Sequence, residues 1–198
     1  MVYPTETVYG LGADASNDAA LERLFAAKGR EAGRGVSLLV AGLDAAASLI
    51  EGPVPAAAVR AADALWPGPL TLVLPASARV APALVGPGGG VGLRCSPDPL
   101  CAALVAALGR PVTSTSANAS GHEPATSAEE ARACFGDAVD VYLDGGPRPG
   151  TAVSTVVEFR GGSAYLLRVG AVDAQTLSRL IAPTVLDSPS SQATPEKI

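Results

Sequence analysis

Apolar and polar residues alternate along the chain in blocks that predict strands and helices in turn. Short apolar runs bounded by Gly and Pro have the length of buried strands, whereas longer Ala- and Leu-rich stretches have helical spacing. In one of these, Leu21, Leu24 and Phe25 recur on one helical face after the capping candidates Asn17 and Asp18. This alternation predicts an α/β domain.

The predicted elements cover most of the chain. Strands are expected at 36–41, 70–74, 91–94, 111–115, 139–143, 153–159 and 164–169. Helices are expected at 17–28, 55–66 and 97–108, and a short one from Asp44 to near Gly52. A further helix is expected after a capping box of Thr126 and Glu129, and a last one from Asp173 onward. Val2 and Tyr3 have the character of the end of a strand, so we expect an N-terminally shortened domain over residues 1–182. Residues 183–198 are rich in Ser, Pro and Thr and lack periodicity, which predicts a disordered tail.

Composition narrows the class of protein. A chain of 198 residues can bury one sizeable core. Its formal charge of −5 argues against a protein that coats nucleic acid, although it allows a locally basic pocket. The three cysteines form no CxxC pair and predict free thiols in a reducing cytoplasm. No stretch has the pattern of a signal peptide or a membrane span, so we expect a cytoplasmic protein without membrane contact.

The first two polar clusters lie at 4–12 and 28–30. In the first, two hydroxyls, a carboxylate and a phenol stand beside two glycines that would let a backbone approach a ligand; the alternative is a turn that satisfies its own backbone. In the second, Lys28 and Arg30 flank a glycine at the end of a predicted helix. They could converge on a polyphosphate, or could simply be solvated cations favoured by the helix dipole.

The other two clusters follow predicted strands. Arg94 ends an apolar strand, and its guanidinium requires partners there, either a ligand or a structural salt bridge. The stretch 114–121 reads STSANASG and concentrates hydroxyl and amide groups, which suits a nucleotide or the polar ends of an amino acid. The alternative for this stretch is a plain Ser-rich loop.

Absent motifs exclude several kinds of chemistry. His122 is the one histidine, and the sequence contains no G-x-S-x-G elbow, no GxxxxGK[ST] loop and no GxGxxG after a strand. A Cys/His metal constellation is also absent from the sequence. The inventory favours positioned substrates, phosphate-binding cations and neutral hydrogen bonds over a protein nucleophile.

Taken together, the clusters resemble the Sua5/YrdC/YciO family, in its single-domain YrdC-type form. The matching motifs are PTETVYGLGAD at 4–14, KGR at 28–30, WPGPLTLVLP at 66–75, GLR at 92–94, STSANASG at 114–121 and STVVE at 154–158. The resemblance covers about residues 2 to 182. It implies an α/β fold with a twisted sheet of mixed parallel and antiparallel strands, flanked by helices around a concave basic cavity.

The resemblance also implies an activity and a set of binding residues. Family members of this type form L-threonylcarbamoyl-AMP and pyrophosphate from ATP, L-threonine and bicarbonate, and a downstream transferase places the threonylcarbamoyl group on tRNA. ATP is expected with Mg²⁺, and a weak tRNA contact is expected as well. The residues expected to bind ATP are Lys28, Arg30, Arg94, Ser116, Asn118 and Arg168. Those expected to bind L-threonine are Thr5, Ser114 and Ser154.

Two alternative functions remain open on the sequence. The same fold could serve as an RNA-binding module, against which the overall acidity and the scarcity of aromatic residues argue. A paralogue could adenylate a different carbamate, because the motifs specify ATP better than they specify the acceptor. The chain also departs from many relatives at Asp98, where they have a histidine.

Overall fold

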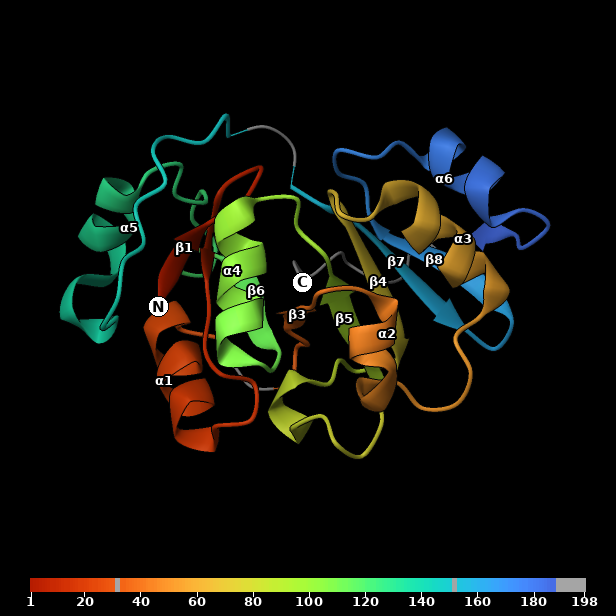
Figure 1. The fold of residues 1–198 in the computed structure, drawn as a ribbon, viewed down its shortest axis with the longest axis horizontal. Coiled ribbons are helices and arrows are strands. Elements are labelled where there is room, and N and C mark those ends of the chain that lie inside the picture. Colours follow the sequence, from red (N-terminus) through yellow and green to blue (C-terminus); the bar gives the residue numbers. More distant parts are fainter. Residues whose placement is uncertain (31–32, 151–152, 188–198) are drawn as a thin grey trace.

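Strands and helices alternate through the chain, as Figure 1 shows. The computed structural model describes residues 1–30, 33–150 and 153–187. Its strands are β1 (Val2–Pro4), β2 (Tyr9–Leu11), β3 (Ser37–Leu39), β4 (Leu70–Pro75), β5 (Gly90–Arg94), β6 (Val112–Ser116), β7 (Thr155–Arg160), β8 (Ser163–Arg168) and β9 (Leu186–Asp187). Its α-helices are α1 (Asp18–Lys28), α2 (Leu43–Ala46), α3 (Ala56–Leu65), α4 (Pro99–Leu108), α5 (Ala128–Phe135) and α6 (Ala174–Ile181).

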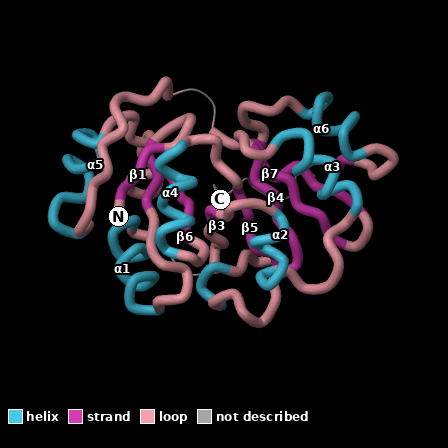
Figure 2. Tube along the Cα trace, viewed as in Figure 1, coloured by secondary structure: helices cyan, strands magenta, loops and turns pink. Residues whose placement is uncertain are grey.

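The strands of the described residues form one mixed sheet in the order β1-β2-β6-β3-β5-β4-β7-β8-β9. The β3–β5, β4–β7 and β8–β9 pairs are parallel, and the remaining neighbours are antiparallel. Helices α1 and α5 lie toward the β1 end, and α3 and α6 toward the β7–β8 end (Figures 1 and 2). The predicted α/β fold with a mixed sheet and flanking helices is confirmed.

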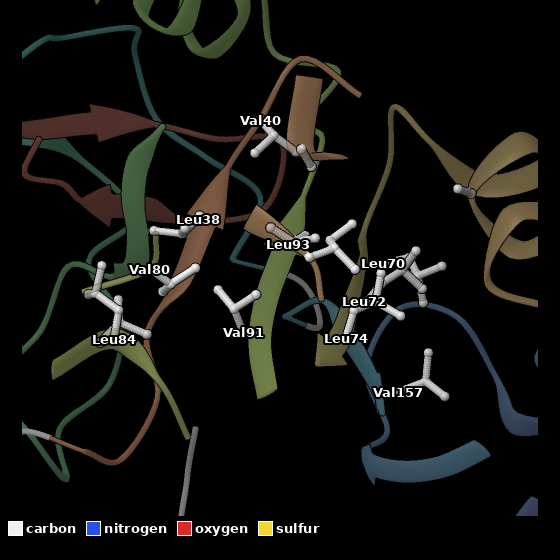
Figure 3. Packing of buried hydrophobic residues seen from close by; sticks show 14 of the residues in the cluster. Leu38, Val40, Leu70, Leu72, Leu74, Val80, Leu84, Val91, Leu93 and Val157 are labelled. Carbon is white, nitrogen blue, oxygen red and sulfur yellow. The ribbon is translucent and has the colours of Figure 1, made fainter. Parts of the chain in front are cut away.

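Successive residues of the central strands point to opposite faces of the sheet, and this alternation separates core from cavity. One face contributes to the main hydrophobic cluster, shown in Figure 3, with Leu38, Leu70, Leu72, Leu74, Val91, Leu93 and Val157. The residues between them, Thr71 in β4 and Arg94 in β5, are paired in register and therefore share the other face. Each fully buried Leu contributes about 1.5–3 kcal/mol to folding, so the apolar face fixes which side the polar residues take.

Helix α1 follows the prediction closely. The Asn17 side chain accepts a hydrogen bond from the Ala20 amide at 3.1 Å and caps the N-terminus of the helix. Gly29, with φ of 59°, ends the helix in the left-handed conformation that glycine adopts most easily. Lys28 thus occupies the last turn, beside the start of the following loop.

Two helices begin at residues other than those that the sequence predicts. At α5 the N-cap is Ser127, which accepts from the Glu130 amide at 3.1 Å, while the Glu130 carboxylate accepts from the Thr126 amide at 2.6 Å. The predicted capping box of Thr126 and Glu129 is therefore wrong by one residue. Asp44 lies inside the first turn of α2, where Gly42 is the N-cap.

Two predicted boundaries also change. The expected strand at 139–143 is reduced to a single bridge between Tyr142 and Val2, although Val2 donates to the Val141 carbonyl at 2.7 Å. At the other end, β9 pairs with β8, so the domain boundary expected at residue 182 is too early. Residues 188–198 of the expected tail lie outside the described residues. The expected shortening of the first strand stays a prediction.

The glycines of the first motif are required by packing around Tyr3, whose side chain is fully buried. A Cβ on Gly12 would lie 2.6 Å from Cε1 of Tyr3 and 2.8 Å from Cγ1 of Val112, and a Cβ on Gly10 would lie 2.9 Å from Cζ of Tyr3. The expectation that both glycines open space for a ligand needs correction at Gly12, which makes room for Tyr3 and Val112.

We predict that Gly12→Ala lowers the free energy of unfolding by about 1–3 kcal/mol, because the added methyl overpacks a rigid ring and a β-branched side chain. Gly86→Ala is the matched control, since the nearest atom to its Cβ would be 3.6 Å away. Urea unfolding of both variants measures the difference. Equal stability of the two variants would contradict this account of Gly12.

Candidate functional site

Two contiguous cavities open on the polar face of the sheet. The narrow cavity is lined by residues that include Thr5, Thr71, Arg94, Ser114 and Ser154. The wide cavity, of about 440 Å³, is lined by residues that include Lys28 and Asn118. Five residues line both cavities and make them one site: Arg30, Thr115, Ser116, Val153 and Arg168.

Arg94 is anchored at the narrow cavity by a carboxylate from the first motif. Its Nη2 donates to Oε1 of Glu6 at 2.5 Å, and the Ser96 hydroxyl donates to Oε2 of the same carboxylate at 2.6 Å. Burial by itself would raise the pKa of Glu6, but Arg94 and the hydroxyl of Ser96 outweigh it and hold the pKa below its usual value. The Glu6 carboxylate is therefore charged at neutral pH and fixes the guanidinium.

Arg168 reaches the same cavity from β8. Its Nε donates to the Ser154 carbonyl at 3.0 Å, and its Nη2 donates to the Ser154 hydroxyl at 3.0 Å. The Ser154 hydroxyl also shares a hydrogen bond of 2.9 Å with the Thr71 hydroxyl. Burial, and then the nearby charge of Arg94, lower the pKa of Arg168 to about 10, so it stays protonated at neutral pH.

The opposite wall of the narrow cavity is made of hydroxyl groups. Ser114 in β6 faces Ser37 in β3 in register, and both line the cavity. Thr5 lies in the turn before β2, where its hydroxyl donates to the Val8 carbonyl at 2.7 Å. Thr5 therefore satisfies a backbone group of its own turn, which is one of the two roles that the sequence left open. It also lines the cavity.

Lys28 is the buried cation of the wide cavity, with only 3% of its surface exposed. Its Nζ donates to the carbonyls of Ser116 at 2.6 Å and Asn118 at 3.1 Å. Burial first, and then the charge of Arg30, lower the pKa of Lys28 to about 8. Lys28 therefore remains mostly charged at neutral pH, held by backbone dipoles rather than by a carboxylate.

The STSANASG stretch folds around Lys28. The Ser116 hydroxyl donates to Oδ1 of Asn118 at 2.5 Å, and Nδ2 of Asn118 donates to the His122 carbonyl at 2.7 Å. Arg30 is fixed from the other side, because its Nη2 donates to the carbonyls of Arg34 and Gly35, each at 3.0 Å. Burial and the charge of Arg34 lower the pKa of Arg30.

All nine site residues expected from the sequence line this site. The wide cavity holds Lys28 and Asn118, the narrow cavity holds Thr5, Arg94, Ser114 and Ser154, and Arg30, Ser116 and Arg168 line both. Among the described residues lining the two cavities, five are cations and the one acid is Glu123. The expected concave, basic cavity is confirmed, whereas the ligand assigned to each residue stays a prediction.

Sequence reasoning gave no role to three residues of the site. Glu6 is counted among the polar groups of the first motif without a role of its own, and Ser37 belongs to none of the four clusters. Thr71 interrupts the apolar strand Leu70–Pro75, and it is only 1% exposed. A buried hydroxyl in the middle of an apolar strand requires a partner, and that signal could have identified Thr71 from the sequence.

Asp98, the departure from many relatives, has a structural role in this chain. It caps α4 by accepting from the Leu100 amide at 2.9 Å. Its Oδ2 also forms an ion pair with Nη2 of Arg148 at 3.1 Å. Asp98 therefore stabilises the loop that contains Arg148.

The described residues contain no group of three or more His, Cys, Asp or Glu residues able to hold a metal ion. None of their helices combines the length and the hydropathy needed to cross a bilayer.

Comparison with known proteins gives consistent matches over nearly the whole described fold. The Sua5_yciO_yrdC family model, described as telomere recombination, matches residues 1–170. The threonylcarbamoyl-AMP synthase of Chromohalobacter salexigens is 42% identical over 154 residues, which are 76% of this chain and 83% of that protein. The synthase of Thiobacillus denitrificans is 40% identical over 162 residues, 82% of this chain and 85% of that protein.

Solved structures match as well. The structure of Pyrococcus abyssi Sua5 complexed with L-threonine superposes with a TM-score of 0.86 at 33% identity, over 94% of this chain. This chain spans 54% of the length of that Sua5 protein. E. coli YciO superposes with a TM-score of 0.79 at 28% identity, over 89% of this chain and 85% of YciO.

We predict that Glu6→Gln destabilises the fold in a pH-dependent way. Because the folded-state pKa of Glu6 is below 4.5, its stabilisation is present above that pH and is lost as the pH falls through the folded-state value. At neutral pH the variant should lose about 1–3 kcal/mol of unfolding free energy, the range for a hydrogen bond to a charged group. Urea unfolding at neutral and at acidic pH checks this.

The control for this prediction is Asp140→Asn, which removes the charge of an exposed pair with Arg23 at 2.8 Å. This change should matter little at any pH, because water screens exposed pairs. A loss in Glu6→Gln that stays constant from neutral to acidic pH would contradict the predicted linkage.

Proposed function

This chain belongs to the Sua5/YciO/YrdC family, and we propose that it is a threonylcarbamoyl-AMP synthase. In the proposed reaction, ATP, L-threonine and bicarbonate give L-threonylcarbamoyl-AMP and pyrophosphate. The enzyme is then a nucleotidyltransferase that supplies an activated carbamoyl group for tRNA modification. The observation that carries the proposal is the single site in which a wide basic cavity meets a narrow cavity lined with hydroxyls.

The wide cavity suits the nucleotide. Its volume of about 440 Å³ lies in the range of cavities that hold small-molecule ligands. Lys28 and Arg30 offer a point charge and a planar fork for phosphate oxygens, and Ser116 and Asn118 add neutral donors and acceptors. Arg168 joins them at the junction with the narrow cavity.

The narrow cavity suits L-threonine. Thr5, Ser114 and Ser154 line it with hydroxyls that can accept and donate hydrogen bonds to an amine, a hydroxyl and a carboxylate. Arg94 lines the narrow cavity only. Lys28 lines the cavity proposed for ATP, whereas Arg94 does not, so the cavities support a role in binding ATP phosphates for Lys28 more than for Arg94.

The proposed chemistry needs no protein nucleophile. The neutral threonine amine bonds to the carbon of bicarbonate and water leaves, which gives a carbamate. A carbamate oxygen then attacks the α-phosphorus of ATP, and the bond to pyrophosphate breaks. The protein positions the reactants and stabilises negative charge as it develops, and removing one preorganised donor of this kind typically costs about 100- to 1,000-fold in rate.

Mg²⁺ would enter with ATP as part of the substrate. Mg²⁺ usually keeps several waters and binds substrate phosphates together with one or two carboxylates. The described residues offer no preformed cluster of acids at the site. We therefore place the ion on the triphosphate and give it no ligand set from this chain.

The product implies a partner. Threonylcarbamoyl-AMP is a reactive mixed anhydride, so a transferase that moves its threonylcarbamoyl group to tRNA must act next. Cytoplasmic tRNA would place both proteins in the cytoplasm, as the sequence predicts. A weak tRNA contact by this chain, and the alternative of an RNA-binding module, are addressed by the same experiment as the activity.

We predict pyrophosphate release that requires ATP, L-threonine and bicarbonate together. Lys28→Ala should lower the rate about 100-fold or more, because a buried cation is lost from the nucleotide cavity. Arg23→Ala is the matched control, since Arg23 lies on the same helix but is exposed and paired with Asp140. The rates are measured with each substrate omitted in turn.

Each outcome of this assay separates the hypotheses. Release that persists without L-threonine would favour a paralogue acting on another carbamate. No release, combined with tRNA binding that falls steeply with salt and does not need ATP, would favour the RNA-binding module. Equal rates for Lys28→Ala and Arg23→Ala would overturn the placement of the phosphates.

A further inference from the structure

A third cavity lies apart from the proposed active site, with walls from helices α2 and α3 (Figure 1), and we call it the Trp66 groove. Its volume is about 520 Å³. Among the described residues, none that lines this groove also lines the narrow or the wide cavity. Most of its wall is apolar and includes Leu43, Val54, Val59 and Pro67. The groove is therefore a separate surface of the molecule.

The indole ring of Trp66 has a fixed orientation in this groove. Trp66 follows the last residue of α3, and its amide donates to the Ala62 carbonyl at 2.8 Å. Its Nε1 donates to the Leu70 carbonyl, also at 2.8 Å. The one polar donor of the side chain is thus used inside the protein, so the ring offers a ligand its π-system. Among aromatic side chains, tryptophan attracts a cation most strongly.

Two carboxylates give the groove a negative charge that its own wall does not neutralise. Asp44 in α2 and Asp63 in α3 line the groove, and both are exposed. Neither side chain forms a hydrogen bond or an ion pair with a described residue, and no described lining residue is a Lys or Arg. Arg60, the one cation of the two helices, donates instead to the carbonyls of Leu180 and Ile181 at the end of α6.

We propose that the Trp66 groove is the docking site for a protein partner that inserts an arginine flanked by apolar residues. The two acids and the indole ring call for a cation, and the apolar wall calls for apolar neighbours. Arginine fits better than lysine, because a planar guanidinium both stacks on an aromatic ring and forks onto carboxylates. The groove has the volume of a small-ligand cavity, so it receives a few side chains of a segment.

Docking at the Trp66 groove would leave the proposed active site open. Cys95 lines the groove, whereas its neighbour Arg94 lines the narrow cavity. Successive residues along a strand point to opposite faces of the sheet, which accounts for this division at the end of β5. A partner could therefore stay bound while ligands enter and leave the two cavities. The proposal does not depend on which reaction those cavities carry out.

Trp66 is the only tryptophan in the chain, so its signal reports on binding at the groove. The probe is a blocked pentapeptide with one arginine between two pairs of leucines, and the matched probe has uncharged citrulline in place of arginine. Titrating ¹⁵N-labelled protein with the arginine peptide should shift the indole N–H signal of Trp66 saturably. The citrulline peptide should bind about tenfold more weakly, because it lacks the cation–π contact and the ion pairs.

Replacing both acids tests the charge complementarity directly. Asp44→Asn combined with Asp63→Asn should weaken binding of the arginine peptide about threefold to tenfold and leave the citrulline peptide unaffected. Glu51→Gln is the matched control, because Glu51 is exposed and lies between α2 and α3 in the chain but does not line the groove. Pyrophosphate release should be the same in all of these proteins, since the three acids lie outside both cavities.

The same titrations can overturn the proposal. No shift with the arginine peptide, or equal affinity for the two peptides, would show that the groove does not recognise a cationic segment. Unchanged affinity in the Asp44 and Asp63 double variant would have the same meaning. L-Arginine amide that binds as tightly as the peptide would assign the groove to a small organic cation. A shift of the Trp66 signal with protein concentration alone would assign it to a second copy of this chain.

Discussion

The structure depends on keeping cations charged on the inner surface of a cavity while the other face of the same sheet is packed with aliphatic side chains. Lys28 is held by backbone carbonyls, Arg94 by the Glu6 carboxylate and Arg168 by Ser154. An unpaired buried charge would be more costly than most single contacts can repay. Each cation therefore has a fixed partner, and the partner determines where the charge points.

The three kinds of partner give the cations different properties. Backbone carbonyls carry no charge to balance Lys28, and its pKa falls to about 8 as burial dominates. Glu6 forms an ion pair with Arg94 and neutralises the charge of its guanidinium. Burial, and then the charge of Arg94, lower the pKa of Arg168 to about 10. The site therefore has its strongest demand for negative charge in the wide cavity and at the junction of the two cavities.

This distribution of charge matches a reaction between a triphosphate and a small carbamate. In the proposed reaction the nucleotide would bring several negative charges to the wide cavity. Hydroxyl groups, which lack a fixed charge, line the wall proposed for a neutral amine that must attack. The division between charged and neutral walls follows strand by strand from the order of the sheet.

The sequence by itself determined the alternation of strands and helices and the helix of Lys28 with its Asn17 cap, because periodicity and caps are local. The nine residues that gather at the site were predicted from the motifs that the chain shares with its family. The sequence did not determine which residue caps α5, since Thr126 and Ser127 are both good caps and the structure has Ser127 in that place. The junction at Arg168, the fixing of Arg94 by Glu6 and the pairing of Thr71 with Ser154 were decided by the tertiary structure alone. These depend on strand order and register, which join residues 88 and 83 positions apart in the chain, and no local pattern records such pairings.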